Sequence, residues 1–257
     1  MNNVNRTLYI PLCGKASVSR RGLFLRDESA ERIWAERGFP LRGKAASPWL
    51  ALYMGVRAAV FDDWVRDQLA AQPDAVVLHV GCGLDSRSER IGAGTWFDVD
   101  MPEVIAERRL HFRESPTCRM IAGDLRDPSW LAELPDAPLI VAMEGVSMYL
   151  QPAELCAFLR ALEARFPRVS LLMDCYSQRA ARLSKYRNPI NAVGVTQVYG
   201  VDDPQSVAGA RFLFRKDHDM TPQRYIDQLR GAEKLIFRKL YAGKLSRSLY
   251  RLYEYRT

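Results

Sequence analysis

The chain has 257 residues, of which 48% are hydrophobic and 26% are charged, and its formal net charge is +7. This length suits one α/β domain with at most a modest cap, and the composition excludes a disordered protein. The sequence contains neither an apolar run near the roughly 20 residues of a membrane span nor the apolar core of a signal peptide, so we expect a cytoplasmic protein that does not enter a membrane.

The first 74 residues have the pattern of helices. One helix is expected at residues 28–36, and a longer one at residues 48–72, where apolar residues recur at helical spacing. Gln72-Pro73-Asp74 ends the second helix, because proline cannot continue the helical hydrogen bonding. We therefore divide the chain into an N-terminal helical region, residues 1–74, and a second region, residues 75–257.

From residue 75 the pattern changes to short apolar runs separated by helical stretches. Such alternation of strand and helix predicts an α/β fold, in which a mostly parallel sheet carries helices on both faces. The expected strands of this part are residues 76–80, 95–99, 118–121, 139–143 and 169–173.

The last 80 residues are less regular and strongly basic. We expect strands at 194–200 and 210–214, a helix at 221–244 and a closing edge strand at 249–256. From Tyr176 to Thr257 the chain has 16 Lys and Arg against 7 Asp and Glu. This excess suits an anionic substrate, an acidic carrier protein or RNA, and a solvated basic face explains it equally well.

Cysteine and histidine give no sign of a disulfide framework or a metal site. The five cysteines are scattered and never form a C-x-x-C pair, and the three histidines are not spaced as metal ligands. We therefore expect reduced thiols and no intrinsic metal. His79, which stands among apolar residues of an expected strand, is interpreted as a hydrogen-bonded core histidine.

A glycine turn directly follows the first strand. Gly81-Cys82-Gly83 lets the chain turn tightly and lets a ligand approach the backbone. A dinucleotide-binding loop requires a third glycine where this chain has Ser86, and Asp85 would repel a pyrophosphate. Asp85 would suit a cationic cofactor without phosphate, such as S-adenosylmethionine. A structural turn with no ligand is the alternative.

Four successive strands are followed by acidic residues. Asp85 follows the first strand and Asp100 the second, about 20 residues after the turn, where a carboxylate can accept hydrogen bonds from ribose hydroxyls. Asp124 follows the third strand, where a carboxylate can bind the adenine amino group of the cofactor. Glu144 follows the fourth strand and would face the middle of the cofactor pocket, near the amino group or the transferable methyl of the cofactor. Ligands of open α/β sheets bind at these strand ends.

These segments together resemble the leucine carboxyl methyltransferase superfamily, and more closely its tetracenomycin-type polyketide O-methyltransferase branch. The resemblance rests on residues 78–87 (LHVGCGLDSR), residues 97–108 (FDVDMPEVIAER) and Glu144 with Tyr149-Leu150, and it extends from Leu8 to Pro204. It implies a Rossmann-like class I methyltransferase with a seven-stranded sheet and S-adenosylmethionine as cofactor. It also implies that residues 1–74 form a helical lid, and we place a substrate cap around residues 176–191.

The resemblance assigns roles to individual residues. Lys15 and Arg57 would approach the methionine carboxylate of the cofactor, and Glu144 would contact its methionine portion. Asp100 would hold the ribose, and Asp124 with Leu125 the adenine. The residues of the first loop would be Gly81, Cys82, Gly83 and Asp85. Arg126 and Tyr149 match positions that face the substrate and are the expected catalytic residues.

Several of these assignments have structural alternatives. Arg57 also fits the edge of an amphipathic helix, and Arg126 could form a surface ion pair with Asp124 or Asp127. Tyr149 could be a buried aromatic residue whose hydroxyl caps a helix. The chain also departs from the family pattern at residues 26–30, which leaves the lid contacts open.

The expected function is O-methylation of a carboxylate or acidic hydroxyl of a small, polyketide-like molecule, which is anionic or bound to a carrier. No histidine stands where it could serve as a base, and a carboxylate acceptor needs none, so this absence favours a carboxylate or an acidic hydroxyl. The alternatives are an RNA methyltransferase and a protein that binds S-adenosylmethionine without catalysis. No RNA-binding motif is visible, so we do not expect a nucleic-acid partner.

Overall fold

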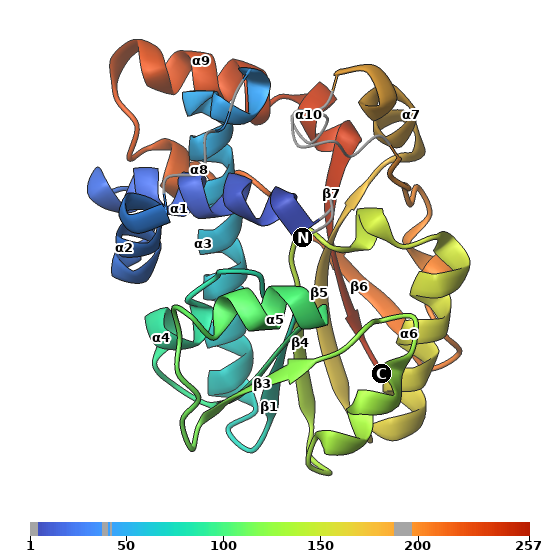
Figure 1. Cartoon of the computed structure of the whole chain (residues 1–257). Helices are drawn as coiled ribbons and strands as arrows, with labels where there is room; N and C mark the ends of the chain where they lie inside the picture. The colour runs from blue at the N-terminus through green and yellow to red at the C-terminus, as the bar shows by residue number, and fades with distance from the viewer. Residues whose placement is uncertain (1–4, 38–40, 42, 188–196) are drawn as a thin grey trace.

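The structure, a computed structural model, describes residues 5–37, 41, 43–187 and 197–257, and is built around one seven-stranded sheet (Figure 1). The strand order is β3-β2-β1-β4-β5-β7-β6. The strands are β1 (Val76–Val80), β2 (Thr95–Asp100), β3 (Cys118–Ala122), β4 (Leu139–Met143), β5 (Val169–Tyr176), β6 (Leu213–Asp217) and β7 (Tyr250–Arg256). The predicted α/β fold with a mostly parallel sheet is confirmed.

The helices lie before and between these strands. The α-helices are α1 (Tyr9–Arg20), α2 (Glu28–Arg37), α3 (Pro48–Ala71), α4 (Arg87–Ile91), α5 (Pro102–Arg108), α6 (Pro152–Arg165), α7 (Gln178–Arg187), α8 (Gln223–Ile226), α9 (Gly231–Tyr241) and α10 (Lys244–Leu249). The described 3-10 helices are η1 (Asn5–Leu8), η2 (Gly43–Ala46), η3 (Pro128–Glu133), η4 (Ser147–Tyr149) and η6 (Pro204–Val207).

One strand runs against the others. β1 to β5 pair in parallel, whereas β7 is antiparallel to both β5 and β6. The expectation that residues 249–256 form an edge strand was therefore wrong, since β7 lies inside the sheet. Leu252, Tyr253 and Tyr255 are buried there, and the polar strand β6, with Arg215 and Lys216, forms the edge.

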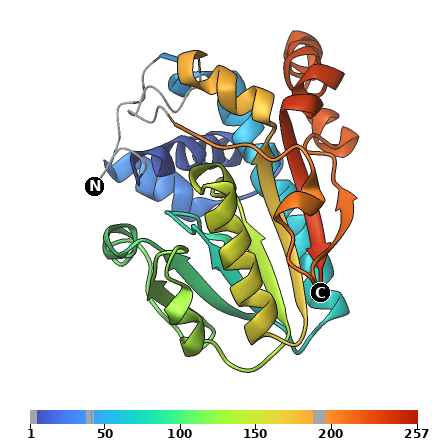
Figure 2. The same ribbon diagram turned by 90° about the vertical axis from the view of Figure 1, so that its right-hand side faces the viewer.

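Side-chain alternation along the strands produces two apolar layers. Val77 and Ile140 point to one face and Leu78 and Val141 to the other, as the period of two requires. The first face is covered by α3, α8 and α9, and the second by η3, α6 and η6 (Figure 2). The predicted lid, residues 1–74, therefore includes in α3 a helix that covers the sheet.

Helix α1, which the sequence did not reveal as a separate helix, crosses α3 at very short range. A Cβ atom on Gly14 would lie 2.6 Å from Met54 Cβ, and one on Gly55 would lie 2.6 Å from both methyl groups of Val18. Two glycines thus let the helices approach closely, and this contact holds the N-terminal helices on the rest of the fold.

The C-terminal predictions were partly correct. The helix expected at 221–244 is divided, because α8 ends at Ile226 and α9 begins only at Gly231, whose φ of +52 is not helical. The strand expected at 210–214 begins at Leu213, and residues 197–200 of the other expected strand form no regular element, whereas 194–196 lie outside the described residues. Of residues 176–191, where a substrate cap was expected, Tyr176 ends β5, Gln178–Arg187 form α7, and residues 188–191 also lie outside the description, so the cap stays a prediction. Among the described helices, none combines the length and apolar character needed to cross a bilayer.

The second apolar layer should contribute strongly to stability. Phe158 on α6 is fully buried in it, so Phe158→Ala should lower the free energy of unfolding by about 3–5 kcal/mol. Leu110→Ala is the matched control, because Leu110 is 64% exposed, and it should change that free energy by less than about 0.5 kcal/mol. Urea unfolding of both variants measures the difference, and equal effects would contradict this packing.

Candidate functional site

The carboxyl ends of the parallel strands open into one cavity of about 800 Å³. This volume lies in the upper part of the range of about 300–1,000 Å³ that small-molecule sites occupy. The cavity is lined by all twelve residues predicted for the site, namely Lys15, Arg57, Gly81, Cys82, Gly83, Asp85, Asp100, Asp124, Leu125, Arg126, Glu144 and Tyr149. The structure thus brings together residues from four strand ends, α1 and α3.

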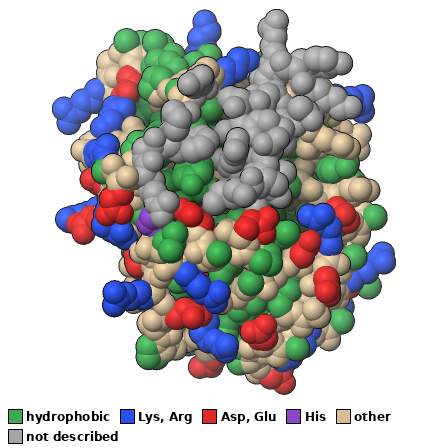
Figure 3. All heavy atoms as spheres, viewed as in Figure 1, with side chains coloured by type: hydrophobic (Ala, Val, Ile, Leu, Met, Phe, Trp, Pro, Cys, Tyr) green, Lys and Arg blue, Asp and Glu red, His purple; other side chains and the backbone are tan. Residues whose placement is uncertain are grey.

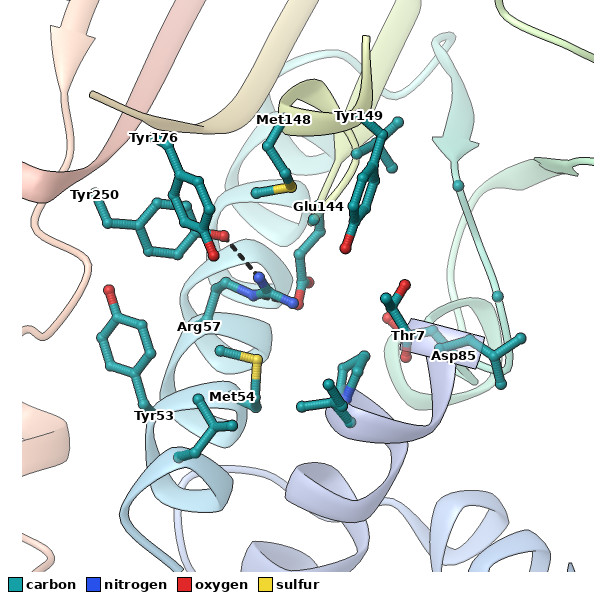
Figure 4. Close-up of a pocket in the computed structure, with 18 of the residues that line it drawn as sticks. Thr7, Tyr53, Met54, Arg57, Asp85, Glu144, Met148, Tyr149, Tyr176 and Tyr250 are labelled. Carbon is teal, nitrogen blue, oxygen red and sulfur yellow. Dashed lines mark hydrogen bonds and ion pairs between the residues drawn. The ribbon is translucent and has the colours of Figure 1, made fainter. Parts of the chain in front are cut away.

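The cavity has two halves of different chemistry. Arg57 and Glu144 lie between them (Figure 4). The strand-end half is lined by Gly81, Gly83, Asp100 and Asp124. The tyrosine wall, on the other side, consists of Tyr53, Tyr176, Tyr241 and Tyr250.

The glycine turn has the backbone geometry that its sequence predicts. Gly81 and Gly83 adopt φ +64 and +50, in the left-handed region that side chains disfavour. The Gly81 amide donates to the Val99 carbonyl at 2.8 Å, which ties the turn to β2. A Cβ atom on Gly81 would lie 2.1 Å from Val146 Cγ2, so the loop after β4 also requires glycine here.

Asp100 lies directly above this turn. Its carboxylate accepts hydrogen bonds from the amides of Gly83 and Met101, each at 2.8 Å. Burial nevertheless raises the pKa of Asp100 to about 6, because these two amides offset the loss of water only in part. At neutral pH the carboxylate is charged and has lone pairs that remain available to ligand hydroxyls.

Three cationic side chains of the protein surround the carboxylate of Asp85. Lys15 Nζ lies 2.9 Å from it, Arg90 Nη1 2.7 Å and Arg87 Nη2 3.3 Å. These neighbours hold the pKa of Asp85 well below its usual range despite burial. Because the protein balances the charge of Asp85, the expected repulsion between this residue and a pyrophosphate is not supported by the structure.

Glu144 is held by two arginines. Arg57 Nε lies 2.9 Å from its Oε1, and Arg87 contacts its other oxygen. Although burial opposes the charge of Glu144, these guanidinium groups lower its pKa to about 2. Arg57 also contacts Asp174 on β5 and the Tyr250 hydroxyl, neither of which was predicted for the site.

Arg126 lies on the outer side of the strand-end half. Its Nε is 3.1 Å from Asp124 Oδ1, and its side chain is 55% exposed. This is the surface ion pair that the sequence left open as an alternative. Arg126 follows β3 at the sheet edge, whereas Tyr176 and Tyr250 come from β5 and β7, with three and four strands between. The role of Arg126 toward an acceptor remains a prediction.

His79 and Cys82 are both buried. His79 Nδ1 lies 3.1 Å from Asp98 Oδ1, and burial lowers its pKa, so the interpretation as a hydrogen-bonded core histidine is confirmed. Burial raises the pKa of Cys82 well above its ordinary value, which keeps it a thiol and agrees with its interpretation as a small turn residue rather than a nucleophile.

The tyrosine wall was not predicted from the sequence. The rings of Tyr53 and Tyr241 stack with centroids 4.9 Å apart, and Tyr176 and Tyr250 meet edge-to-face, also at 4.9 Å. A partial signal existed, since Tyr53 precedes Arg57 by four residues on α3 and Tyr176 ends β5. Tyr241 and Tyr250 reach the cavity from elements whose positions depend on the C-terminal topology.

The known proteins that this chain resembles are methyltransferases. The leucine carboxyl methyltransferase family model matches residues 15–163, more than half of the chain. The tetracenomycin polyketide synthesis O-methyltransferase TcmP of Streptomyces glaucescens is 34% identical over 188 residues, which are 70% of this chain and 69% of that protein. The S-adenosyl-L-methionine-dependent methyltransferase dpfgK of Gibberella zeae is 26% identical over 182 residues, 64% of this chain and 61% of the relative.

Solved structures agree on the fold. The magnesium protoporphyrin IX methyltransferase ChlM of Synechocystis, solved with bound SAH, superimposes with a TM-score of 0.52 at 14% identity. The alignment covers 89% of this chain and 92% of that one. At this identity the match shows the class I methyltransferase fold and carries no residue roles.

The contact between Gly81 and Val146 can be tested directly. Gly81→Ala should lower the free energy of unfolding by roughly 2–5 kcal/mol, the sum of about 1–2 kcal/mol of backbone strain and about 1–3 kcal/mol of steric overlap. Gly83→Ala is the matched control, because its Cβ would meet nothing closer than Leu8 Cβ at 3.6 Å. Val146→Ala should recover part of the loss in Gly81→Ala and none in Gly83→Ala, as urea unfolding would show.

Proposed function

Since this chain belongs to the leucine carboxyl methyltransferase family and is an S-adenosylmethionine-dependent methyltransferase, we propose that it methylates an oxygen of an aromatic, polyketide-like small molecule. The acceptor oxygen belongs to a carboxylate or to an acidic hydroxyl group. The observation that carries this proposal is a single cavity in which strand-end carboxylates and a tyrosine wall face each other across Arg57 and Glu144.

The strand-end half fits S-adenosylmethionine. Gly81 and Gly83 leave room beside the backbone, and Asp100 offers carboxylate oxygens for ribose hydroxyls. Lys15, which is paired with Asp85, and Arg57, which is paired with Glu144 and Asp174, also line the cavity and are the donors that we assign to the methionine carboxylate, and Glu144 is the acceptor assigned to its ammonium group. The cofactor would supply a methyl group on a sulfonium ion: the acceptor oxygen bonds to the methyl carbon, and S-adenosylhomocysteine leaves with the electron pair of the carbon–sulfur bond.

The tyrosine wall fits an aromatic acceptor. Stacked and edge-to-face rings offer flat apolar surfaces with a few hydroxyl groups, a combination typical of sites for aromatic ligands. Leu183, Leu240 and Leu245 line the same cavity and are 53–62% exposed, so the entrance is apolar as well. Hydrophobic side chains also gather over α9 in Figure 3.

Positive charge at the entrance supports an anionic acceptor. Lys44 and Lys239 line the cavity, and a negative group on the acceptor, or on an acidic carrier that delivers it, would be attracted to them. The RNA alternative has less support, because several basic residues of the C-terminal third are paired on the surface. Arg247 contacts Asp219 at 2.9 Å and Arg251 contacts Asp217 at 2.7 Å.

The chain contributes chiefly by positioning the reactants. Residues of two cavity walls hold donor and acceptor close together, and this removes much of the entropic barrier of a bimolecular displacement. Apolar side chains at the entrance reduce the water around the reacting atoms.

Methyl transfer can be measured with mass spectrometry. The protein is incubated with S-adenosylmethionine and a panel of aromatic carboxylic acids, phenols and the corresponding methyl esters and ethers. We expect one methyl group on oxygen for acids or phenols and none for the esters and ethers. If tRNA is methylated and no small acceptor is, the proposal is wrong.

Cofactor binding should depend on pH through Asp100. This carboxylate is charged above about pH 6 and protonated below, and only the charged form accepts hydrogen bonds from both ribose hydroxyls. Affinity for S-adenosylhomocysteine should therefore fall as the pH decreases below 6, by up to about tenfold per pH unit. Isothermal titration calorimetry between pH 5 and 8 measures this.

Asp100→Asn tests this prediction, and Asp136→Asn is its matched control. Asp100→Asn should bind weakly at every pH and lose the dependence, whereas Asp136, an 80% exposed side chain paired with Arg165, should leave both affinity and pH dependence unchanged. A pH dependence that persists in Asp100→Asn would exclude the assigned role.

A further inference from the structure

A cluster of charged and phenolic groups lies where the two halves of the cavity meet. Asp174 of β5 contacts the hydroxyl of Tyr250, the first residue of β7, and Arg57 Nη1 donates to that hydroxyl at 2.7 Å and to Asp174 at 3.1 Å. Tyr250 lines the cavity, and Asp174 lies behind it, fully buried. Figure 4 shows Tyr250 pointing toward Arg57 beside Tyr176.

The charges in this cluster are unevenly shared. Glu144 interacts with both Arg57 and Arg87, and its pKa is lowered to about 2. Asp174 shares Arg57 with Glu144 and otherwise contacts two neutral donors, the Gly145 amide at 2.7 Å and the Tyr250 hydroxyl. Burial therefore outweighs these contacts and raises the pKa of Asp174. Of the two carboxylates, Asp174 is the one that takes up a proton readily.

The Tyr250 hydroxyl connects Asp174 with the cavity. A phenol has one hydrogen to donate and two lone pairs to accept. Tyr250 donates its hydrogen to Asp174 and accepts one hydrogen bond from Arg57, which leaves one lone pair. Burial raises the pKa of Tyr250 well above its ordinary value, so the hydroxyl remains protonated and can pass a proton on without accumulating as phenolate.

We propose that Tyr250 and Asp174 accept the proton of a phenolic or enolic hydroxyl while that oxygen is methylated. This proposal rests on the function proposed above and assigns its acceptor to the hydroxyl class. The acceptor oxygen bonds to the methyl carbon as the carbon–sulfur bond breaks, and the electron pair of that bond stays on sulfur. The acceptor hydrogen moves to Tyr250 Oη, and the hydrogen of Tyr250 moves to Asp174 Oδ2.

Tyr250 and Asp174 together would serve as the general base that no histidine provides. A carboxylate acceptor is already anionic and would gain nothing from a proton-accepting pair behind an aromatic wall. An uncharged hydroxyl gains nucleophilicity as it loses its proton, and general bases of this kind contribute typically 10²- to 10⁴-fold. The sequence showed no base because an aspartate and a tyrosine 76 residues apart form this one together.

The decisive experiment compares a naphthol with the matching naphthoic acid as acceptors. Tyr250→Phe keeps the ring and removes the hydroxyl, so turnover of the naphthol should fall about 100-fold or more while turnover of the naphthoic acid changes little. Tyr255→Phe is the matched control, since Tyr255 lies on the same strand, is buried, and donates to the Pro204 carbonyl away from the cavity. It should leave both turnovers unchanged.

The pH profile separates proton transfer from a structural role. Asp174 is faced by Arg57 from α3, Glu144 after β4 and Tyr250 from β7. Tyr53 on α3, Tyr149 on η4 and the neighbouring Cys175 also interact with it electrostatically, and Tyr176 interacts with Tyr53 and Tyr250. In the wild-type protein, naphthol turnover should reach a plateau once Asp174 is ionised. In Tyr250→Phe it should keep rising toward about pH 10, where the acceptor ionises without help.

A spectroscopic measurement gives a readout besides turnover. The absorbance of bound naphthol reports its ionisation, and in complexes with S-adenosylhomocysteine the wild-type protein should show naphtholate at a lower pH than Tyr250→Phe does. Calorimetry should give equal affinities of both proteins for S-adenosylhomocysteine.

The outcomes are distinct. Equal losses with naphthol and naphthoic acid, an unchanged pH profile, or turnover of the naphthoic acid alone would each overturn the role of Tyr250 and Asp174. Methylation of neither acceptor, nor of any acid or phenol in the wider panel, would overturn the proposed function itself.

Discussion

The structure depends above all on the buried ion pairs that Asp85 and Glu144 each form with neighbouring arginines. Arg87 contacts Asp62 of α3, Asp85 after β1 and Glu144 after β4, so one guanidinium joins three segments below the cavity. A buried charge that loses its partner is costly, typically by 3–5 kcal/mol, so these groups hold each other in a single arrangement. The loops that line the cavity are thereby fixed before a ligand arrives.

The strand-end half of the cavity was predictable because each of its signals is local. An apolar run followed by glycine or a carboxylate shows where a strand ends, and parallel strands bring those ends to one edge. Gly81, Asp100, Asp124 and Glu144 therefore could be assigned to one site before their positions were known, and all four line the cavity. The order of the strands, in contrast, was not predicted, because no local pattern in the sequence encodes it.

The tyrosine wall could not be predicted in this way, since its members come together through register and topology. Tyr176 and Tyr250 are opposite each other in the β5–β7 pairing, and this pairing was not foreseen because residues 249–256 were placed at an edge. The same error concealed the contact between Tyr250 and Asp174. For Asp85 the position was predicted, but the neighbours that balance its charge were not. These three cations are Lys15 on α1 and Arg87 and Arg90 on α4.

The place of β7 between β5 and β6 has a consequence for biosynthesis. β6 precedes β7 in the chain, but in the described sheet it pairs with β7 and lies at the edge beyond it. During translation β6 therefore leaves the ribosome before its partner exists, and the growing sheet ends at β5 with an open hydrogen-bonding edge. An unpaired strand edge can form hydrogen bonds with another chain, so the edge of β5 is a site for association between nascent chains until β7 has inserted.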